Sequence, residues 1–153
     1  MRILHYIVLV GVMLAATNVS ATDAPYQQIT GARLLNLFTD KTVVSEYHDT
    51  EGGIKDFRFT EHHFKDGTTD YIERGQKTEK GRWKIIGKQK ICYTYPGNET
   101  FNETYCFFVF KEGECYYNYG LAAMTLHGPK NRDWWTSRFI IKGEGGSCDA
   151  AVG

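Results

Sequence analysis

The sequence predicts a mainly β protein: an antiparallel meander of seven or eight strands that closes into a small barrel, preceded by one short N-terminal helix. After residue 40 the hydrophobic pattern repeats every second residue, which is typical of half-buried strands. Turn-forming sequences separate the segments at short intervals. Ten tyrosines, nine phenylalanines and three tryptophans, against three prolines, indicate a packed core. Closure into a barrel removes the exposed edges of such a sheet.

The first 21 residues have the three parts of a secretory signal. Arg2 and His5 precede an unbroken apolar run at 7–16, and Val-Ser-Ala at 19–21 supplies the small residues that a signal peptidase reads. The run is shorter than the about 20 apolar residues of a membrane-spanning helix. We therefore expect a signal peptide at 1–21 and one barrel-like domain at 22–153. The expected location is periplasmic or secreted, with no integral membrane segment in the mature chain.

The charge balance argues against two classes of partner. The chain has 18 basic and 18 acidic residues, and no run of Lys or Arg is longer than two. Nucleic-acid binding requires a basic surface, and binding to a membrane surface requires a basic amphipathic helix. We expect neither.

The elements follow in order along the chain. A helix is expected at 30–38, where Thr30 can cap it and an apolar stripe follows, formed by Leu34, Leu35, Leu37 and Phe38. Strands are expected at 41–48, 54–65, 68–74, 81–86, 89–95, 103–110, 115–120 and 136–142, the second of them either continuous or broken near Glu61. Asp66-Gly67 and Gly87-Lys88 are typical hairpin turns.

Pairing the strands across these turns sorts their side chains into two faces. A two-residue turn at Gly87-Lys88 places Trp83 opposite Cys92, and a turn at 111–114 places Phe108 opposite Tyr117. The face expected inside consists of Trp83, Ile85, Cys92, Cys106, Phe108, Phe110, Tyr117 and Tyr119. The other face carries Arg82, Lys84, Ile91, Tyr93, Tyr105, Phe107 and Val109. It is less polar than a solvated face, so we expect the helix to cover it.

The four cysteines are expected to form two disulfides, as is usual in exported proteins. Cys92 and Cys106 are equidistant from residue 99, in the middle of a turn-forming stretch, so a hairpin there would place them directly opposite each other. Cys115 and Cys148 would then pair. The alternative, a zinc site, has little support because the sequence contains no Cys-x-x-Cys pair.

Several short motifs together resemble a known group of proteins. They are Gly-Arg-Trp at 81–83, Ile-Cys-Tyr at 91–93, Tyr-Cys-Phe at 105–107, Cys-Tyr-Tyr at 115–117 and Lys-Gly at 142–143 with Ser-Cys at 147–148. The pattern is similar to a family of small exported proteins of Gram-negative bacteria that is classified as a domain of unknown function. The resemblance implies a periplasmic, lipocalin-like barrel. It implies no catalytic residue.

Candidates for chemistry are few, and we predict neither an enzyme nor a cofactor. His48, Glu61, His62, His63 and His127 could ligate a metal, but adjacent residues of a strand point to opposite faces, so His62 and His63 would not share one ion. We therefore expect no metal site and no catalytic residue. The common nucleophile, metalloprotease, P-loop and dinucleotide motifs are absent from the sequence.

The segment 121–135 is the one long irregular insertion in an otherwise tight-turned sequence. Its loop at 127–135 contains Lys130, Arg132, Trp134 and Trp135, a composition typical of binding surfaces, and we expect a ligand or partner contact at the barrel end that bears this loop. Asn98 and Asn102 satisfy the N-glycosylation pattern. We interpret both as chance matches, given the bacterial resemblance.

Two classes of function remain for a non-enzymatic exported barrel. It could bind a small apolar or aromatic ligand inside, or act through an exposed loop as an envelope interaction protein, for example an inhibitor of a lysozyme-type hydrolase. An interior cavity of about 200–300 Å³ or more would favour the ligand. An interior filled by Trp83, Phe108 and Tyr117 would favour the protein partner.

Overall fold

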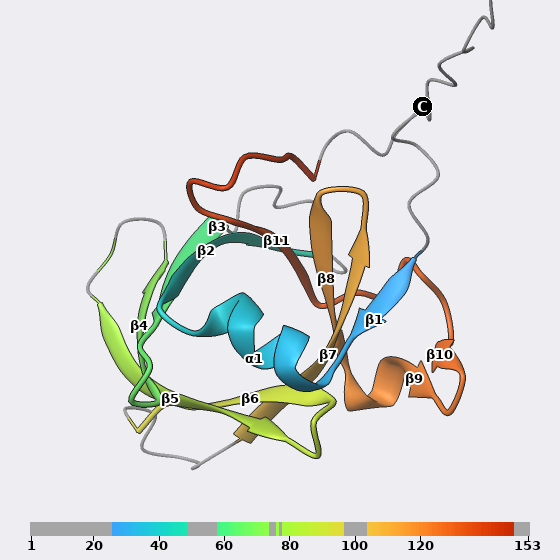
Figure 1. Cartoon of the computed structure of the whole chain (residues 1–153), viewed down its shortest axis with the longest axis horizontal. Coiled ribbons are helices and arrows are strands. Elements are labelled where there is room, and N and C mark those ends of the chain that lie inside the picture. Colours follow the sequence, from blue (N-terminus) through green and yellow to red (C-terminus); the bar gives the residue numbers. More distant parts are fainter. Residues whose placement is uncertain (1–25, 49–57, 74–75, 77, 97–103, 149–153) are drawn as a thin grey trace, which may run out of the picture.

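The chain forms a closed antiparallel β-barrel with one short α-helix, as predicted. A computed structural model describes residues 26–48, 58–73, 76, 78–96 and 104–148. The strands follow one another around the barrel in the order β7-β6-β5-β4-β3-β2-β11-β8, and β8 pairs with β7 to close the ring (Figure 1). Their bounds are Lys41–Tyr47 (β2), Arg58–His63 (β3), Thr68–Glu73 (β4), Glu79–Ile86 (β5), Lys90–Thr94 (β6), Thr104–Glu112 (β7), Cys115–Gly120 (β8) and Ser137–Ile141 (β11).

Three short strands, which the sequence pattern does not predict, complete the sheets. β1 (Gln27–Ile29) pairs with β7, while β9 (Met124–Thr125) and β10 (Gly128–Pro129) form a separate hairpin after a 3-10 turn (Leu121–Ala123). The predicted strand around Glu61 is continuous through that residue within β3.

The helix α1 (Gly31–Phe38) closes one end of the barrel. It lies inside the outline of the strand ring in Figure 1, and its buried side chains are Leu34 and Phe38. Thr30 occupies the N-cap position but makes no side-chain capping bond. Instead, the Gly31 N–H donates to the carbonyl of Lys88, at 2.7 Å, which fixes the start of the helix to the β5–β6 turn.

The core fills the half of the barrel next to α1. Its buried residues are Ile29, Leu34, Phe38, Val43, Trp83, Ile91, Tyr93, Val109, Phe139 and Ile141. This half, with the short turns after β3, β5 and β7, is the closed end. The opposite end, where β2 and β4 finish and β5 and β7 begin, is the open end.

The predicted register between β5 and β6 is wrong by one residue. Trp83 pairs with Tyr93, and Cys92 pairs with Lys84, because the turn contains three residues, 87–89, rather than two. Gly87 and Lys88 both have positive φ in this turn. A shift of one residue exchanges the faces of β6 and β7 relative to β5. Trp83 is inside, as predicted, but with the face that carries Tyr93 and not with the cysteines.

Phe108 and Tyr117, which the sequence analysis places inside, lie on the outer face of the barrel. Phe108 pairs with Tyr119 and not, as predicted, with Tyr117, because the β7–β8 turn contains two residues, 113–114, rather than four. Phe108 and Tyr117 belong to a second cluster outside the barrel, whose buried residues are Phe110, Cys115, Tyr117 and Tyr119, with Tyr26, Phe108, Ala123, Met124, Trp135 and Cys148 packed against it. The one-residue shift between β5 and β6 puts the face with Phe108 on the outside of the barrel. The sequence pattern does not reveal this, because an outer face that other segments of the chain cover is as apolar as an interior.

Both predicted disulfides are present, Cys92–Cys106 and Cys115–Cys148. Cys92 and Cys106 are directly opposite each other in the β6–β7 ladder, as the hairpin symmetry predicts.

The helix α1 packs against the face that it was predicted to cover, which carries Ile91, Tyr93 and Val109. This face is the interior of the barrel and not its outer surface.

Some predictions concern residues that the structure does not describe. The signal peptide at 1–21 and the sequons at Asn98 and Asn102 lie outside the described residues. Within the described part of the chain, no helix has the length and apolar character needed to cross a membrane.

Candidate functional site

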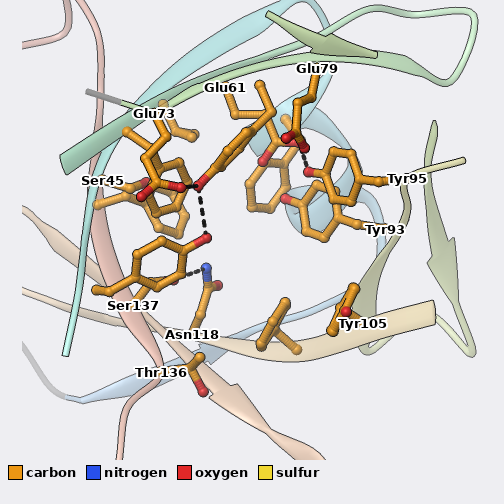
Figure 2. A pocket seen from close by; sticks show the side chains of 17 residues that line it. Ser45, Glu61, Glu73, Glu79, Tyr93, Tyr95, Tyr105, Asn118, Thr136 and Ser137 are labelled. Carbon is orange, nitrogen blue, oxygen red and sulfur yellow. Dashed lines mark hydrogen bonds between the residues drawn. The ribbon is translucent and has the colours of Figure 1, made fainter. Parts of the chain in front are cut away.

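The open half of the barrel contains a cavity of about 460 Å³. Its deepest wall includes Phe38 of α1, so the helix forms the floor. Tyr105 and Glu79 lie at the open end and are exposed to solvent. Figure 2 shows side chains from the surrounding strands converging on this space. The barrel is therefore filled in its closed half and hollow in its open half.

Aromatic side chains dominate the wall of the cavity. The tyrosines that line it are Tyr47, Tyr71, Tyr93, Tyr95 and Tyr105. The phenylalanines are Phe38, Phe59, Phe107 and Phe139. Aromatic rings provide large apolar surfaces, and tyrosine adds a hydroxyl that orients a ligand. Such a wall suits a ligand with a flat or apolar body.

Glu61 is the most deeply buried acid of the cavity wall, with 4 % of its surface exposed. Its Oε1 accepts hydrogen bonds from the hydroxyls of Tyr95, at 2.5 Å, and Thr69, at 2.8 Å. Burial raises the pKa of Glu61 to about 7, although these two hydrogen bonds act in the opposite direction. The side chain therefore changes its charge near neutral pH.

His63, on the same face of β3, is next to Glu61. Its Nε2 lies 3.8 Å from Glu61 Oε2 and 2.9 Å from the hydroxyl of Tyr93. Burial lowers the pKa of His63 to about 3. In mildly acidic solution, Glu61 is protonated and His63 is neutral, so the pair is not an ion pair. Burying two neutral groups avoids the cost of desolvating two charges.

Two further acids, Glu73 and Glu79, line the cavity near its open end. Glu73 accepts a hydrogen bond of 2.8 Å from the hydroxyl of Tyr71, which lies 3.1 Å from the hydroxyl of Tyr47. The side chain of Glu79 makes no hydrogen bond or ion pair with the described residues. Burial raises the pKa of Tyr71 and of Tyr47, so both hydroxyls remain protonated donors at physiological pH.

Gly81 allows Tyr95 to reach Glu61. Gly81 lies on the inner face of β5, and a Cβ there would lie 2.6 Å from Cδ1 and Cε1 of Tyr95 and 3.0 Å from Cγ2 of Thr69. Because no Cβ fits so close to a ring, any side chain would displace Tyr95 and break its bond to Glu61.

We expect Gly81→Ala to lower the free energy of unfolding by about 2 kcal/mol, as overpacked sites do. Chemical denaturation measures the loss. The matched control is Gly120→Ala on β8, where the nearest atom to a Cβ is Thr136 Oγ1 at 3.6 Å. This control should stay within about 0.5 kcal/mol of the wild type. Equal stabilities of all three proteins would mean that Tyr95 does not pack on Gly81.

The segment predicted to bind a ligand or partner joins strand ends at the open end of the barrel, and Thr136, the residue that follows it, lines the cavity. Lys130 and Trp134 are exposed, the latter by 55 %. The Arg132 guanidinium lies 4.4 Å from the ring centre of Tyr26 and also pairs with an acid of β7. These contacts do not test whether a ligand or partner binds to the segment, so that binding stays a prediction.

Trp135 packs against the outer surface of the barrel, unlike its neighbour Trp134. Its ring meets His48 edge-on at a centroid distance of 4.1 Å and lies 6.1 Å from Tyr117 on the outer face of β8. The guanidinium of Arg138 lies over its indole at 5.3 Å. Of the two adjacent tryptophans, Trp135 anchors the segment to the barrel and Trp134 faces solvent.

The histidines named from the sequence do not gather into a metal site in the described part of the chain. His62 and His63 point to opposite faces of β3, as predicted: His62 Nδ1 lies 2.8 Å from Thr42 Oγ1, while His63 is inside. No group of three or more His, Cys, Asp or Glu among the described residues could hold a metal ion.

The chain was compared with known protein families, with curated proteins and with solved structures, and none of the three comparisons found a match. The resemblance to exported bacterial proteins stays a prediction. The fold and the cavity are therefore the basis for any functional proposal.

Proposed function

We propose that this protein is a non-enzymatic, exported binding protein that holds a small ligand with an apolar or aromatic body inside its barrel. The observation that carries the proposal is the cavity of about 460 Å³, which exceeds the volume that we set for the ligand-binding class. One end is open and nine of its lining residues are aromatic.

Two disulfides support the exported part of the proposal, because disulfides persist in oxidising compartments. The signal predicted at residues 1–21 points in the same direction. The resemblance to small exported proteins of Gram-negative bacteria would place the protein in the periplasm. A ligand carrier in that compartment would meet small molecules that have entered from outside the cell.

The proposal predicts that filling the cavity abolishes binding. Ser45 is buried, lines the cavity from β2 and has a small side chain. We expect the wild type to increase the fluorescence of the neutral probe N-phenyl-1-naphthylamine with a stoichiometry of one. Ser45→Phe should weaken binding by about tenfold or more, because the new ring occupies the space of the ligand.

Val44→Phe is the matched control, since Val44 precedes Ser45 in β2 and therefore faces outward. It should bind the probe as the wild type does. Circular dichroism and a thermal melt establish that both variants are folded. Absence of probe binding by the wild type, or unchanged binding by a folded Ser45→Phe protein, would contradict the proposal.

The second candidate, an envelope interaction protein or hydrolase inhibitor, has one observation in its favour. Trp134 is 55 % exposed and Leu126 is fully exposed, and both belong to the segment after β8. Exposed tryptophan is typical of protein-binding sites. The cavity gives the ligand-binding proposal a more specific basis, because these two exposed side chains define no partner.

A further inference from the structure

The acids of the cavity point to the charge of the ligand. We propose that the cavity is selective for a small organic amine, whose ammonium group binds among the glutamates and whose apolar body lies against the rings. This inference rests on the proposed function and adds the chemical class of the ligand. Three observations support it: the acidic wall of the cavity, the arrangement of its glutamates, and a buried hydrogen-bond acceptor without a partner among the described residues.

The described wall of the cavity is acidic. Glu61, Glu73 and Glu79 line it, while its described lining contains no lysine, arginine or histidine. In a cavity with low-dielectric walls, acids attract a cation more strongly than they do in water. A ligand with a carboxylate or phosphate group would instead be repelled.

Strand register places these acids around one tyrosine. Tyr71 on β4 pairs with Glu61 on β3 and with Glu79 on β5, so the three lie in one row across the sheet. Neighbouring strands are about 4.8 Å apart, which sets Glu61 and Glu79 about 10 Å apart at the backbone. Glu73 follows two residues after Tyr71 and faces the same side. Figure 2 shows the three carboxylates along the same wall.

The wall also contains a buried acceptor, Asn118 Oδ1, that has no partner among the described residues. Asn118 is 7 % exposed, lines the cavity and uses its Nδ2 to donate to Ser137 Oγ at 3.0 Å. Its Oδ1 has no hydrogen-bond partner among the described residues. Figure 2 shows Asn118 reaching up from β8 toward the opposite, acidic wall. A buried acceptor without a partner is costly, and an N–H donor of a ligand would satisfy it.

The aromatic residues complete an environment suited to an amine. Cations bind to the faces of tyrosine and phenylalanine rings, most strongly where water is excluded. Tyr47, Tyr71 and Phe59 lie near the acids, with the rings of Tyr47 and Phe59 4.7 Å apart and those of Phe59 and Tyr71 5.1 Å apart. A primary amine attached to a flat body can therefore use carboxylates and rings together.

Three probes with the same indole body and different head groups test this inference: tryptamine, tryptophol and indole-3-propionate. Each competes with N-phenyl-1-naphthylamine for the full-length mature protein at pH 7.5. We expect the amine to bind about tenfold tighter than the alcohol, and the acid to bind more weakly than both. Replacing both outer acids, Glu73→Gln and Glu79→Gln, should remove most of the preference for the amine and leave the affinity for the alcohol within about twofold.

Glu114→Gln is the control, since Glu114 is exposed in the β7–β8 turn at the closed end. It should keep the full preference for the amine. Equal binding of the three probes, tighter binding of the acid, or an unchanged preference in the double variant would overturn the inference while leaving the proposed function in place. If neither the naphthylamine nor any indole binds, the proposed function itself is wrong.

Discussion

Trp83→Ala is expected to lower the free energy of unfolding by about 3–5 kcal/mol, as truncation of large buried aromatic residues does. Trp83 is 7 % exposed and packs near Phe38 and His63, at ring distances of 6.5 and 5.5 Å. Its Nε1 also donates a hydrogen bond of 2.9 Å to the carbonyl of Phe64. The substitution leaves a void beneath α1 and removes one of the two hydrogen bonds that the Phe64 carbonyl accepts, the other coming from the Gly67 N–H at 3.0 Å.

Arg82→Ala provides the control at the neighbouring position. Arg82 is exposed on the outer face of β5, and its loss should cost less than about 1 kcal/mol. Urea denaturation measures both variants, and Trp134 and Trp135 remain as fluorescent reporters in Trp83→Ala. Small and equal losses would mean that the core does not depend on Trp83 and that the inner face of β5 is assigned wrongly.

The strands were predictable because each buries one face and is followed by a turn of recognisable sequence. Asp66-Gly67 is such a turn, with Gly67 at positive φ between β3 and β4. The pairing of Cys92 with Cys106 was predictable for a related reason: the connection between their strands is centred midway between them. These features depend only on residues close together in the chain, so one sequence is enough to predict them.

The choice of the inner face was not predictable from local sequence. Both faces of β7 carry aromatic residues, because its inner face lines the core and cavity while its outer face packs against Tyr26 and the segment after β8. Only the length of the turn at 87–89 decides between the faces. That turn has a third residue, and Lys88 in it accepts a hydrogen bond from the start of α1, a contact between distant parts of the chain.

The candidate site was hidden for the same reason. The sequence places Tyr93, Tyr105 and Phe107 on a face too apolar for solvent, and this is the signal that could have located the cavity. For Glu61, residue type alone suggests no more than a possible metal ligand. Its contacts with Tyr95 and His63 join residues far apart in the sequence, and burial, not residue type, gives it a raised pKa.

The pair of Glu61 and His63 should make the stability of the fold depend on pH in two opposite ways. The pKa of Glu61 rises from 4.5 to about 7 on folding. Its contribution to the free energy of unfolding is therefore full below pH 4.5 and is lost as the pH rises toward 7. The pKa of His63 falls from 6.5 to about 3, so its contribution is full above pH 6.5 and is lost as the pH falls toward 3. Between pH 4.5 and 6.5 the two slopes cancel.

Glu61→Gln isolates the contribution of the acid. Glutamine keeps an oxygen that can accept from Tyr95 and Thr69, so at pH 4.5 the variant should be within about 1 kcal/mol of the wild type. Its advantage over the wild type should then grow by about 3 kcal/mol by pH 8, because only the wild type must bury a carboxylate there. Urea denaturation of both proteins at several pH values measures this difference, and groups shared by the two proteins cancel. Glu114→Gln, exposed in a turn, should follow the wild type. A constant difference between Glu61→Gln and the wild type from pH 4.5 to 8 would mean that folding does not raise the pKa of Glu61.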